Sequence, residues 1–309
     1  MTRTNGLQHR SCASAGKTVS SRLVLGTAQL GLPYGVANQS GLMDQQEAAK
    51  ILELAWSEGV ATLDTAAAYG ESERRLGEIG VGQWRVISKL PAVPGSAGAD
   101  VGAWVRSSIE HSLRLLGVPS LYGLLLHRPE QLLEPAGKAL YRALLQAKDR
   151  GEITKIGVSI YGPEDLDALG GQFAFDLIQG PMNIFDRRLS ATGWLAKLHA
   201  AGVEIHIRSI FLQGLLLMEP LKRPAQFNVW QDLWEKWDAW LEEQSLTPLQ
   251  ACVGFASAQQ DVDGIVVGVD SLRHLRGILE SAKNVPVPPP AHLQSDDLEL
   301  INPSRWSKH

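Results

Sequence analysis

Short apolar runs alternate with longer segments of helical periodicity along most of this chain. The apolar runs are rich in Val, Ile and Leu, which is typical of strands buried on both faces of a parallel sheet. We expect strands at residues 21–27, 59–64, 84–90, 121–126, 154–160, 176–182, 203–210 and 264–269. The segments between them carry helix signals, such as Asp44 before one apolar repeat and Gly117 after another. They predict helices at residues 44–58, 73–80, 100–116, 137–150, 163–169, 191–201, 228–244, 248–259 and 271–282.

This order of elements predicts the fold class. A continuous alternation of strands and helices favours a single (β/α)8 TIM barrel, in the α/β class, over an open doubly wound sheet. Neither a G-x-G-x-x-G after the first strand nor a G-x-x-x-x-G-K-[ST] occurs, which disfavours a Rossmann or P-loop domain. We expect the barrel at residues 21–284, a flexible N-terminal tail at 1–20 and an extended, proline-rich C-terminal tail at 285–309. For the basic first segment, organelle targeting is the alternative.

Composition and charge limit the classes of partner that the protein can bind. The 309 residues carry a formal charge of −4 and a pI near 6.1, which lacks the basic field of a nucleic-acid-binding protein. No apolar run is long enough for a membrane span, so we expect no membrane partner. Cys12 and Cys252 have no disulfide or metal spacing, which favours a reducing, cytoplasmic setting. The sequence makes no prediction of oligomeric state.

Four polar residues follow three consecutive predicted strands. Asp64 and Tyr69 follow the second, Lys89 ends the third and His127 ends the fourth. Barrel strands lie about 5 Å apart, and barrels keep their chemistry at the carboxyl ends of the strands, so these side chains can meet. A tyrosine has a reference pKa of about 10, and an adjacent lysine favours its phenolate form. An aspartate beside the lysine would keep the ammonium charged and oriented.

This set, called the tetrad from here on, resembles the catalytic tetrad of the aldo-keto reductases, which are NADP(H)- or NAD(H)-dependent (β/α)8 barrels. The segments 25–35, 157–159, 179–186 and 208–216 also resemble a bacterial branch of that family, and the similarity spans residues 21–280. The resemblance implies that Tyr69 is the general acid, that Lys89 and Asp64 support it, and that His127 orients the substrate carbonyl. It further implies a set of cofactor-binding residues: Gly26, Thr27, Asp64, Ser159, Gln179, Arg208, Ser209, Leu212, Gln213, Gly214, Gly268, Arg273 and His274.

The chain departs from the family pattern at the cofactor site. Ile160 replaces an asparagine that many members have after the serine, and Arg208 replaces an aromatic residue that stacks on the nicotinamide. Gly268, His274 and nearby residues replace the usual groups around the adenosine phosphate, where Arg273 could substitute. The expected cofactor is NADP(H) in preference to NAD(H).

Structural interpretations stay open for these residues. Asp64 could cap a helix, Tyr69 could be a loop aromatic, and Arg208 could form an ion pair with Asp186 at the barrel rim. Glu204 and His206 are interpreted as rim or inter-layer residues of the barrel because no further metal ligand is spaced beside them. Four tryptophans at helical spacing predict a helix packed on the barrel or on a partner chain: Trp230, Trp234, Trp237 and Trp240. Residues 219–227 are the candidate for a flap over the site.

Two functions follow from the sequence. The first is an enzyme that reduces an aldehyde, a ketone or a carbohydrate-like carbonyl substrate with a nicotinamide cofactor. The alternative is a cofactor-binding barrel with a regulatory or scaffold role and little catalysis. The intact tetrad favours the enzyme, whereas the substrate itself depends on loops whose meeting point a sequence does not show.

Overall fold

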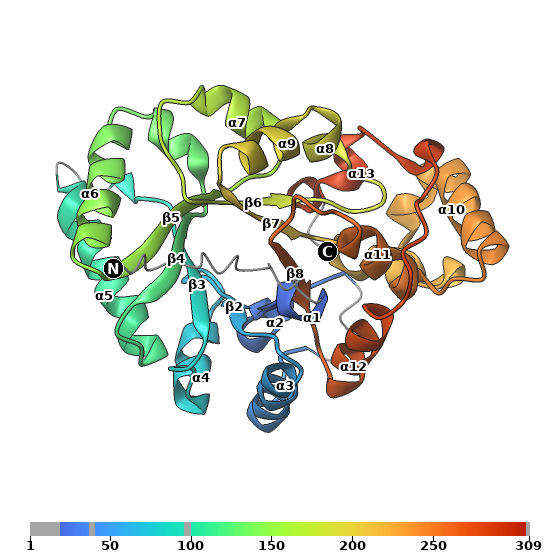
Figure 1. Ribbon diagram of the computed structural model, residues 1–309, viewed down its shortest axis with the longest axis horizontal. Coiled ribbons are helices and arrows are strands. Elements are labelled where there is room, and N and C mark those ends of the chain that lie inside the picture. The colour runs from blue at the N-terminus through green and yellow to red at the C-terminus, as the bar shows by residue number, and fades with distance from the viewer. Residues whose placement is uncertain (1–18, 37–40, 96–99, 307–309) are drawn as a thin grey trace, which may run out of the picture.

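The computed structural model describes residues 19–36, 41–95 and 100–306. These residues contain a closed barrel of parallel strands in the order β1-β2-β3-β4-β5-β6-β7-β8, surrounded by helices (Figure 1). The strands are β1 (Leu23–Gly26), β2 (Thr62–Asp64), β3 (Arg85–Leu90), β4 (Leu121–Leu126), β5 (Ile153–Ser159), β6 (Leu177–Pro181), β7 (Glu204–Arg208) and β8 (Gly264–Gly268). The predicted (β/α)8 barrel is therefore confirmed. Residues 1–18 of the predicted N-terminal tail lie outside the described residues.

Helices separate the strands. The α-helices are α1 (Val19–Arg22), α2 (Ala28–Gly31), α3 (Gln45–Ser57), α4 (Ser72–Ile79), α5 (Val101–Leu116), α6 (Gly137–Asp149), α7 (Pro163–Leu169), α8 (Arg188–Ala191), α9 (Trp194–Ala200), α10 (Gln231–Glu243), α11 (Pro248–Ser257), α12 (Leu272–Ser281) and α13 (Leu298–Ile301). Short 3₁₀ turns are η2 (Pro129–Leu133), η3 (Leu212–Leu217), η4 (Pro220–Lys222), η5 (Ala225–Trp230), η6 (Ala291–Leu293) and η7 (Pro303–Arg305). The predicted caps are present, because the Asp44 side chain accepts from the backbone N–H of Gln46 and Gly117 ends α5 at φ 65°.

The strand register brings the ends of β1 to β4 together. Asp64 pairs with Gly26 of β1 and with Ile87 of β3, and Lys89 pairs with Leu125 of β4. Beyond the strands, the backbone N–H of His127 still donates to the carbonyl of Leu90 at 3.1 Å. The polar residues that follow these strands therefore share one end of the barrel.

The chain enters the barrel differently from the sequence prediction. Residues 21–22 were expected in the first strand, but they belong to α1. The Arg22 guanidinium donates to the carbonyls of Ser257 and Gln259, at 3.1 and 2.5 Å, where α11 ends. A cation is favourable at the C-terminal carbonyls of a helix, so this contact stabilises the attachment of α1 to the end of α11.

The C-terminal segment also differs from a fully extended tail. Residues 285–290 are extended, and Arg187 donates to the carbonyls of Pro289 and Pro290 at 3.3 and 3.0 Å. The short helices η6, α13 and η7 follow, and Leu293, Leu300 and Ile301 of this region are buried. Apolar side chains inside the segment therefore pack it onto the protein.

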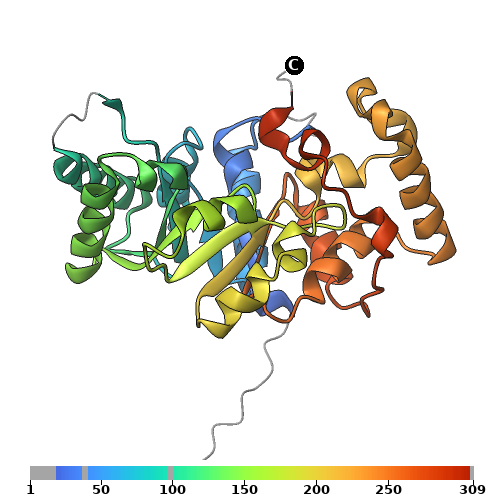
Figure 2. The same cartoon turned by 90° about the horizontal axis from the view of Figure 1, so that it is seen from above.

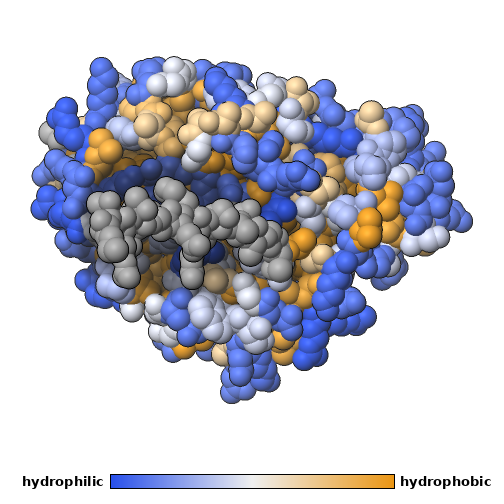
Figure 3. All heavy atoms as spheres, viewed as in Figure 1, coloured by the Kyte–Doolittle hydropathy of each residue, from blue (hydrophilic) through white to orange (hydrophobic). Residues whose placement is uncertain are grey.

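Helix α10 lies at the periphery beside α11 (Figures 1 and 2). The tryptophans Trp234, Trp237 and Trp240 are buried, and the Trp234 ring lies 5.2 Å from that of Phe185, measured between centroids. This agrees with the interpretation of a helix packed on the barrel. On the face shown in Figure 3 the outer helices are mostly hydrophilic, with hydrophobic patches between them.

Candidate active site

A buried ion pair lies at the carboxyl end of β2 and β3. Lys89 Nζ is 2.6 Å from Asp64 Oδ2, and the two side chains are 1% and 5% exposed. Lys89 also donates to the Thr65 carbonyl at 3.0 Å, and Gln179 Nε2 donates to the second Asp64 oxygen at 2.7 Å. Burial acts against the charge of Lys89, but Asp64 and Tyr69 outweigh it, so the pKa of Lys89 is raised. The lysine is therefore a permanent cation in this position.

Tyr69 lies above this ion pair. Lys89 Nζ is 5.0 Å from the centroid of the Tyr69 ring, and the His127 ring lies edge-on to the tyrosine with 6.1 Å between centroids. The Tyr69 backbone is held in a turn, since its N–H donates to the Ala66 carbonyl at 2.9 Å. All four tetrad residues are thus brought together from β2, β3, β4 and the loop after β2.

His127 is held neutral. Burial and the positive charges of Lys89 and Arg208 lower the pKa of His127 to about 4, although Asp64 acts in the opposite direction. A neutral imidazole has one N–H that can donate to an oxygen atom placed between it and Tyr69. The pair can therefore offer two hydrogen-bond donors to the same oxygen.

Buried hydroxyl groups fix the loop that carries Tyr69. Ser72 donates to the Thr27 carbonyl at 2.9 Å, and its hydroxyl lies 3.1 Å from that of Thr65. Gly31 of α2 packs so closely that a Cβ atom there would lie 1.7 Å from the Tyr69 carbonyl oxygen. Only glycine allows this approach, so α2 and the Tyr69 loop are positioned against each other.

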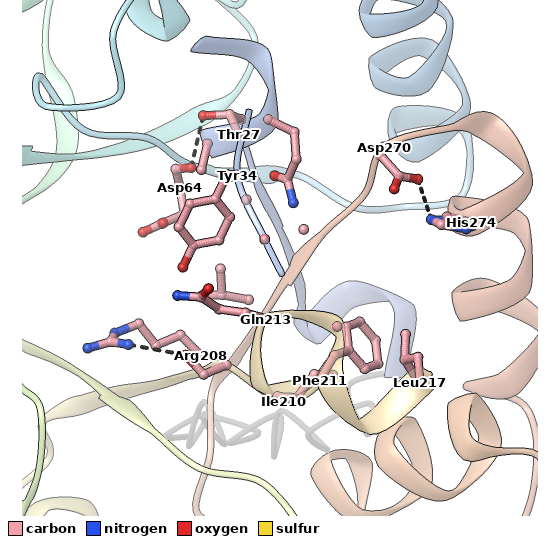
Figure 4. A pocket seen from close by; sticks show the side chains of 18 of the residues that line it. Thr27, Tyr34, Asp64, Arg208, Ile210, Phe211, Gln213, Leu217, Asp270 and His274 are labelled. Carbon is pink, nitrogen blue, oxygen red and sulfur yellow. Dashed lines mark hydrogen bonds and ion pairs between the residues drawn. The ribbon is translucent and has the colours of Figure 1, made fainter. Parts of the chain in front are cut away.

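A cavity of about 330 Å³ opens beside Tyr69 and Asp64, within the range of small-molecule sites. Figure 4 shows Tyr34, Arg208 and Gln213 near Asp64, with Asp270 and His274 on the far side of the cavity. The predicted site residues that line it are Gly26, Thr27, Asp64, Tyr69, Arg208, Ser209, Gln213, Gly214, Gly268 and His274. Most of the predicted cofactor-binding residues therefore surround one space.

Six predicted residues do not line the cavity. Lys89 and His127 contact Tyr69 as described above. Ser159 donates to the Gln179 side chain at 3.3 Å and Gln179 donates to Asp64, so Ser159 supports Asp64 through Gln179. Leu212 is buried in the core, and Arg273 is exposed on α12.

The loop after β7 has an unusual backbone. Ser209, Leu212 and Gln213 are non-glycine residues with φ values of 60°, 48° and 54°, and Gly214 follows at 89°. Such conformations cost free energy and concentrate at ligand-binding loops. Ser209, Gln213 and Gly214 line the cavity, which makes this loop the strongest candidate for holding an extended ligand.

Sequence reasoning missed several lining residues, of which Tyr34, Phe211, Met218 and Asp270 are examples. Asp270 lies two residues after β8, so the strand-end rule that found the tetrad could have found it. Its carboxylate pairs with His274 Nδ1, and this contact raises the pKa of His274. The aromatic and apolar members come from loops, where no spacing signals their position.

The proposed rim ion pair between Arg208 and Asp186 is wrong. Asp186 pairs with Arg188, whose Nη2 lies 2.9 Å from the carboxylate, because Arg188 is only two residues away and shares the same turn. Arg208 instead donates to Ser209 Oγ and to the Ile160 carbonyl.

The described residues contain neither a membrane-spanning helix nor a metal-binding cluster. Within residues 19–36, 41–95 and 100–306, no helix is both long and apolar enough to cross a membrane. Across the same residues, no group of three or more His, Cys, Asp or Glu side chains is arranged to hold a metal ion. Glu204 and His206 contact each other, with 2.7 Å between Glu204 Oε1 and His206 Nε2.

Comparison with known proteins places these features in a family context. The family model described as "Aldo/keto reductase family" matches residues 22–294. D-threo-aldose 1-dehydrogenase of a Pseudomonas species is 28% identical over 249 residues, which cover 69% of this chain and 75% of the relative.

Solved structures give the same result. A Pseudomonas aeruginosa protein assigned to the aldo-keto reductases superimposes with a TM-score of 0.62 at 28% identity, over 89% of this chain and 93% of the other. The holo form of an aldo-keto reductase from Bacillus halodurans superimposes with a TM-score of 0.69 at 19% identity, over 88% and 90% of the two chains. The second likeness supports the fold alone.

Proposed function

The chain belongs to the aldo/keto reductase family, and on this premise we propose that it transfers hydride between a nicotinamide cofactor and a carbonyl or sugar-like substrate, with Tyr69 as general acid. Family membership and the aldose dehydrogenase relative make it an oxidoreductase of this broad class. The observation that carries the specific proposal is the buried Lys89–Asp64 ion pair beneath Tyr69, at the edge of the cavity.

In the direction of reduction, the substrate carbonyl oxygen sits between Tyr69 and His127. The nicotinamide group, when bound, supplies the hydride that the carbonyl carbon accepts. The Tyr69 hydroxyl donates its proton to the oxygen, so an alcohol forms and a phenolate remains. The Lys89 ammonium stabilises that phenolate, and Asp64 keeps the ammonium in place. His127, neutral above pH 4, donates an N–H to the same oxygen.

The residues present fit an extended dinucleotide. The cavity runs from Asp64 and Tyr69 to Asp270 and His274, and four of its lining residues are glycines, which present only backbone: Gly26, Gly35, Gly214 and Gly268. The hydroxyl of Ser209 and the amide of Gln213 are donors suited to phosphate oxygens. Ser159 and Gln179, behind Asp64, remain the proposed contacts of the carboxamide end.

We also propose that NADP(H) is preferred over NAD(H). Arg273 is exposed at the start of α12, and the raised pKa of His274 keeps it more cationic, so both can face a ribose phosphate. Asp270 opposes this preference through its negative charge. Titration of the protein with NADPH and NADH, followed by nicotinamide fluorescence, measures the ratio of the two Kd values. A lower Kd for NADH would reverse the preference.

The experiment that tests the catalytic role is Tyr69→Phe. The variant keeps the ring but removes the proton donor, so we expect kcat on a panel of aldehydes and keto-sugars to fall by about 10²- to 10⁴-fold. Cofactor binding, measured by fluorescence, should remain. Equal NAD(P)H oxidation by Tyr69→Phe and the wild type, or none by either, would contradict the proposal and favour a binding role.

A further inference from the structure

Arg208 lies on the wall of the cavity, on the same side as Asp64 (Figure 4). It is the last residue of β7, and its Nη2 donates to the Ile160 carbonyl at 2.8 Å while Nη1 donates to Ser209 Oγ at 3.1 Å. Its Cζ lies 5.2 Å from the centroid of the Tyr161 ring. The guanidinium is therefore fixed in a partly buried position on the wall of the cavity.

This guanidinium has no carboxylate partner among residues 19–36, 41–95 and 100–306. The nearby carboxylates are used by other cations, since Asp64 is paired with Lys89 and Asp186 with Arg188. Both contacts of Arg208 are to neutral oxygens, so its charge is not compensated, and a guanidinium has five N–H donors. A partly buried cation in this state is stabilised by an anionic ligand.

The charge of Arg208 acts at the tetrad end of the cavity. It lowers the pKa of His127, after burial and Lys89, and it opposes the rise that burial causes in the pKa of Tyr34. Figure 4 shows Arg208 on the same side as Asp64 and Tyr34, opposite Asp270 and His274. A group held by Arg208 therefore lies near the reacting carbonyl.

We infer that Arg208 binds a carboxylate on the substrate itself, so that the enzyme acts on carbonyl compounds that carry an acid group, such as aldehyde acids or sugar acids. This rests on the proposed function. The planar fork of the guanidinium matches a carboxylate, and Ser209 and Tyr34 lie beside it as further hydrogen-bonding groups. The family resemblance implies a cofactor contact for Arg208, and a contact with the cofactor pyrophosphate is the competing outcome.

The test compares two substrates of similar shape. We would measure kcat/KM for 4-carboxybenzaldehyde and for its uncharged methyl ester, with the wild type, Arg208→Gln and Arg208→Lys. The measured quantity is the ratio of the two kcat/KM values, so a general loss of activity cancels. We expect Arg208→Gln to lower this ratio by roughly 10- to 100-fold and Arg208→Lys to restore part of it.

A binding measurement separates this inference from the proposed function. Calorimetric titration with benzoate and with uncharged benzamide requires no turnover. We expect Arg208→Gln to raise the Kd of benzoate by at least about 10-fold relative to the Kd of benzamide. If benzoate binding depends on Arg208 but no carbonyl is reduced, Arg208 binds carboxylates as inferred, whereas the proposed function, and with it the acid-bearing substrate, fails. If carbonyls are reduced but both ratios are unchanged in Arg208→Gln, the inference is overturned, and a higher Kd for NADPH then assigns Arg208 to the cofactor.

Discussion

The two ends of this barrel contain nearly the same residues but differ in chemistry. The tetrad at the carboxyl end has an Asp, a Tyr, a Lys and a His. The opposite end has a set that we call the lower cluster: Tyr122, Lys155, Glu204 and His206. In both, the lysine Nζ lies close to the tyrosine ring, 5.0 Å from its centroid in the tetrad and 5.1 Å in the lower cluster. Residue types alone therefore do not distinguish the two.

The hydrogen bonds of the carboxylates make the difference. In the lower cluster the Tyr122 hydroxyl donates to Glu204 at 2.7 Å, Lys155 contacts the same oxygen and His206 the other. Burial and this hydrogen bond raise the pKa of Tyr122, which disfavours its phenolate. In the tetrad, Lys89 and Gln179 donate hydrogen bonds to the two carboxylate oxygens of Asp64, and Tyr69 lines the cavity. A tyrosine whose proton is accepted by a carboxylate is a structural group, whereas one facing a lysine and a cavity is available for proton transfer.

The largest expected effect is the difference in kcat/KM between variants of Lys89, in the tetrad, and of Lys155, in the lower cluster. Lys89→Met removes the cation that, under the proposed function, stabilises the Tyr69 phenolate, so we expect kcat/KM to fall by about 10²- to 10⁴-fold. Lys155→Met is the matched control, since the same change in the lower cluster should leave kcat/KM within about threefold. Steady-state kinetics with one carbonyl substrate measures both. Equal losses in the two variants, with both folded by circular dichroism, would show that the lower cluster also supports catalysis.

A smaller loss of kcat is expected when the loop that positions Tyr69 is disturbed. Tyr122 is fixed on β4, but Tyr69 depends on a loop that approaches Gly31 closely. Gly31→Ala would place a Cβ 1.7 Å from the Tyr69 carbonyl oxygen, so the loop must move. We expect kcat to fall by about 10²-fold, because a shift of about 1 Å in a catalytic group has this order of effect.

The control is Gly82→Ala, just before β3, where an added Cβ meets no atom within 4 Å. This variant should retain the kcat of the wild type. If Gly31→Ala also retained it, the position of Tyr69 would not depend on this packing.

The comparison also shows what the sequence could predict. The barrel and tetrad follow from local signals, because strand ends in a closed parallel barrel converge whatever the loops do. The role of Glu204 could be predicted only as that of a layer residue, since its partners Tyr122 and Lys155 are 82 and 49 positions away. Tyr34 was missed because the loop that carries it has no periodicity. An ion pair of Asp186 with Arg208 was kept as an alternative, but a closer arginine, Arg188, takes this carboxylate.

The smallest expected effect is a loss of folding stability at low pH, which occurs in a different pH range for each end of the barrel. The folded pKa of His127 is about 4 against an ordinary 6.5, so the unfolded chain takes up this proton first as pH falls. The stability that neutral His127 contributes is therefore fully present above pH 6.5 and is lost as pH falls toward 4, by about 2 kcal/mol at pH 5. For Glu204, burial acts against ionisation, but His206 and Lys155 outweigh it and lower the pKa to about 2 from 4.5. Its contribution is lost only between pH 4.5 and 2.

Thermal unfolding between pH 7 and 3 distinguishes the two windows. His127→Gln should flatten the fall in Tm between pH 6.5 and 4.5, and Glu204→Gln should flatten the fall below pH 4.5. His199→Gln, whose side chain is 59% exposed, is the control and should leave both slopes unchanged. If His127→Gln kept the wild-type slope, the imidazole would not be held neutral by burial and by the cations beside it. The tetrad would then have a protonated histidine at mildly acidic pH, and kcat/KM would change near pH 6.5 instead of near 4.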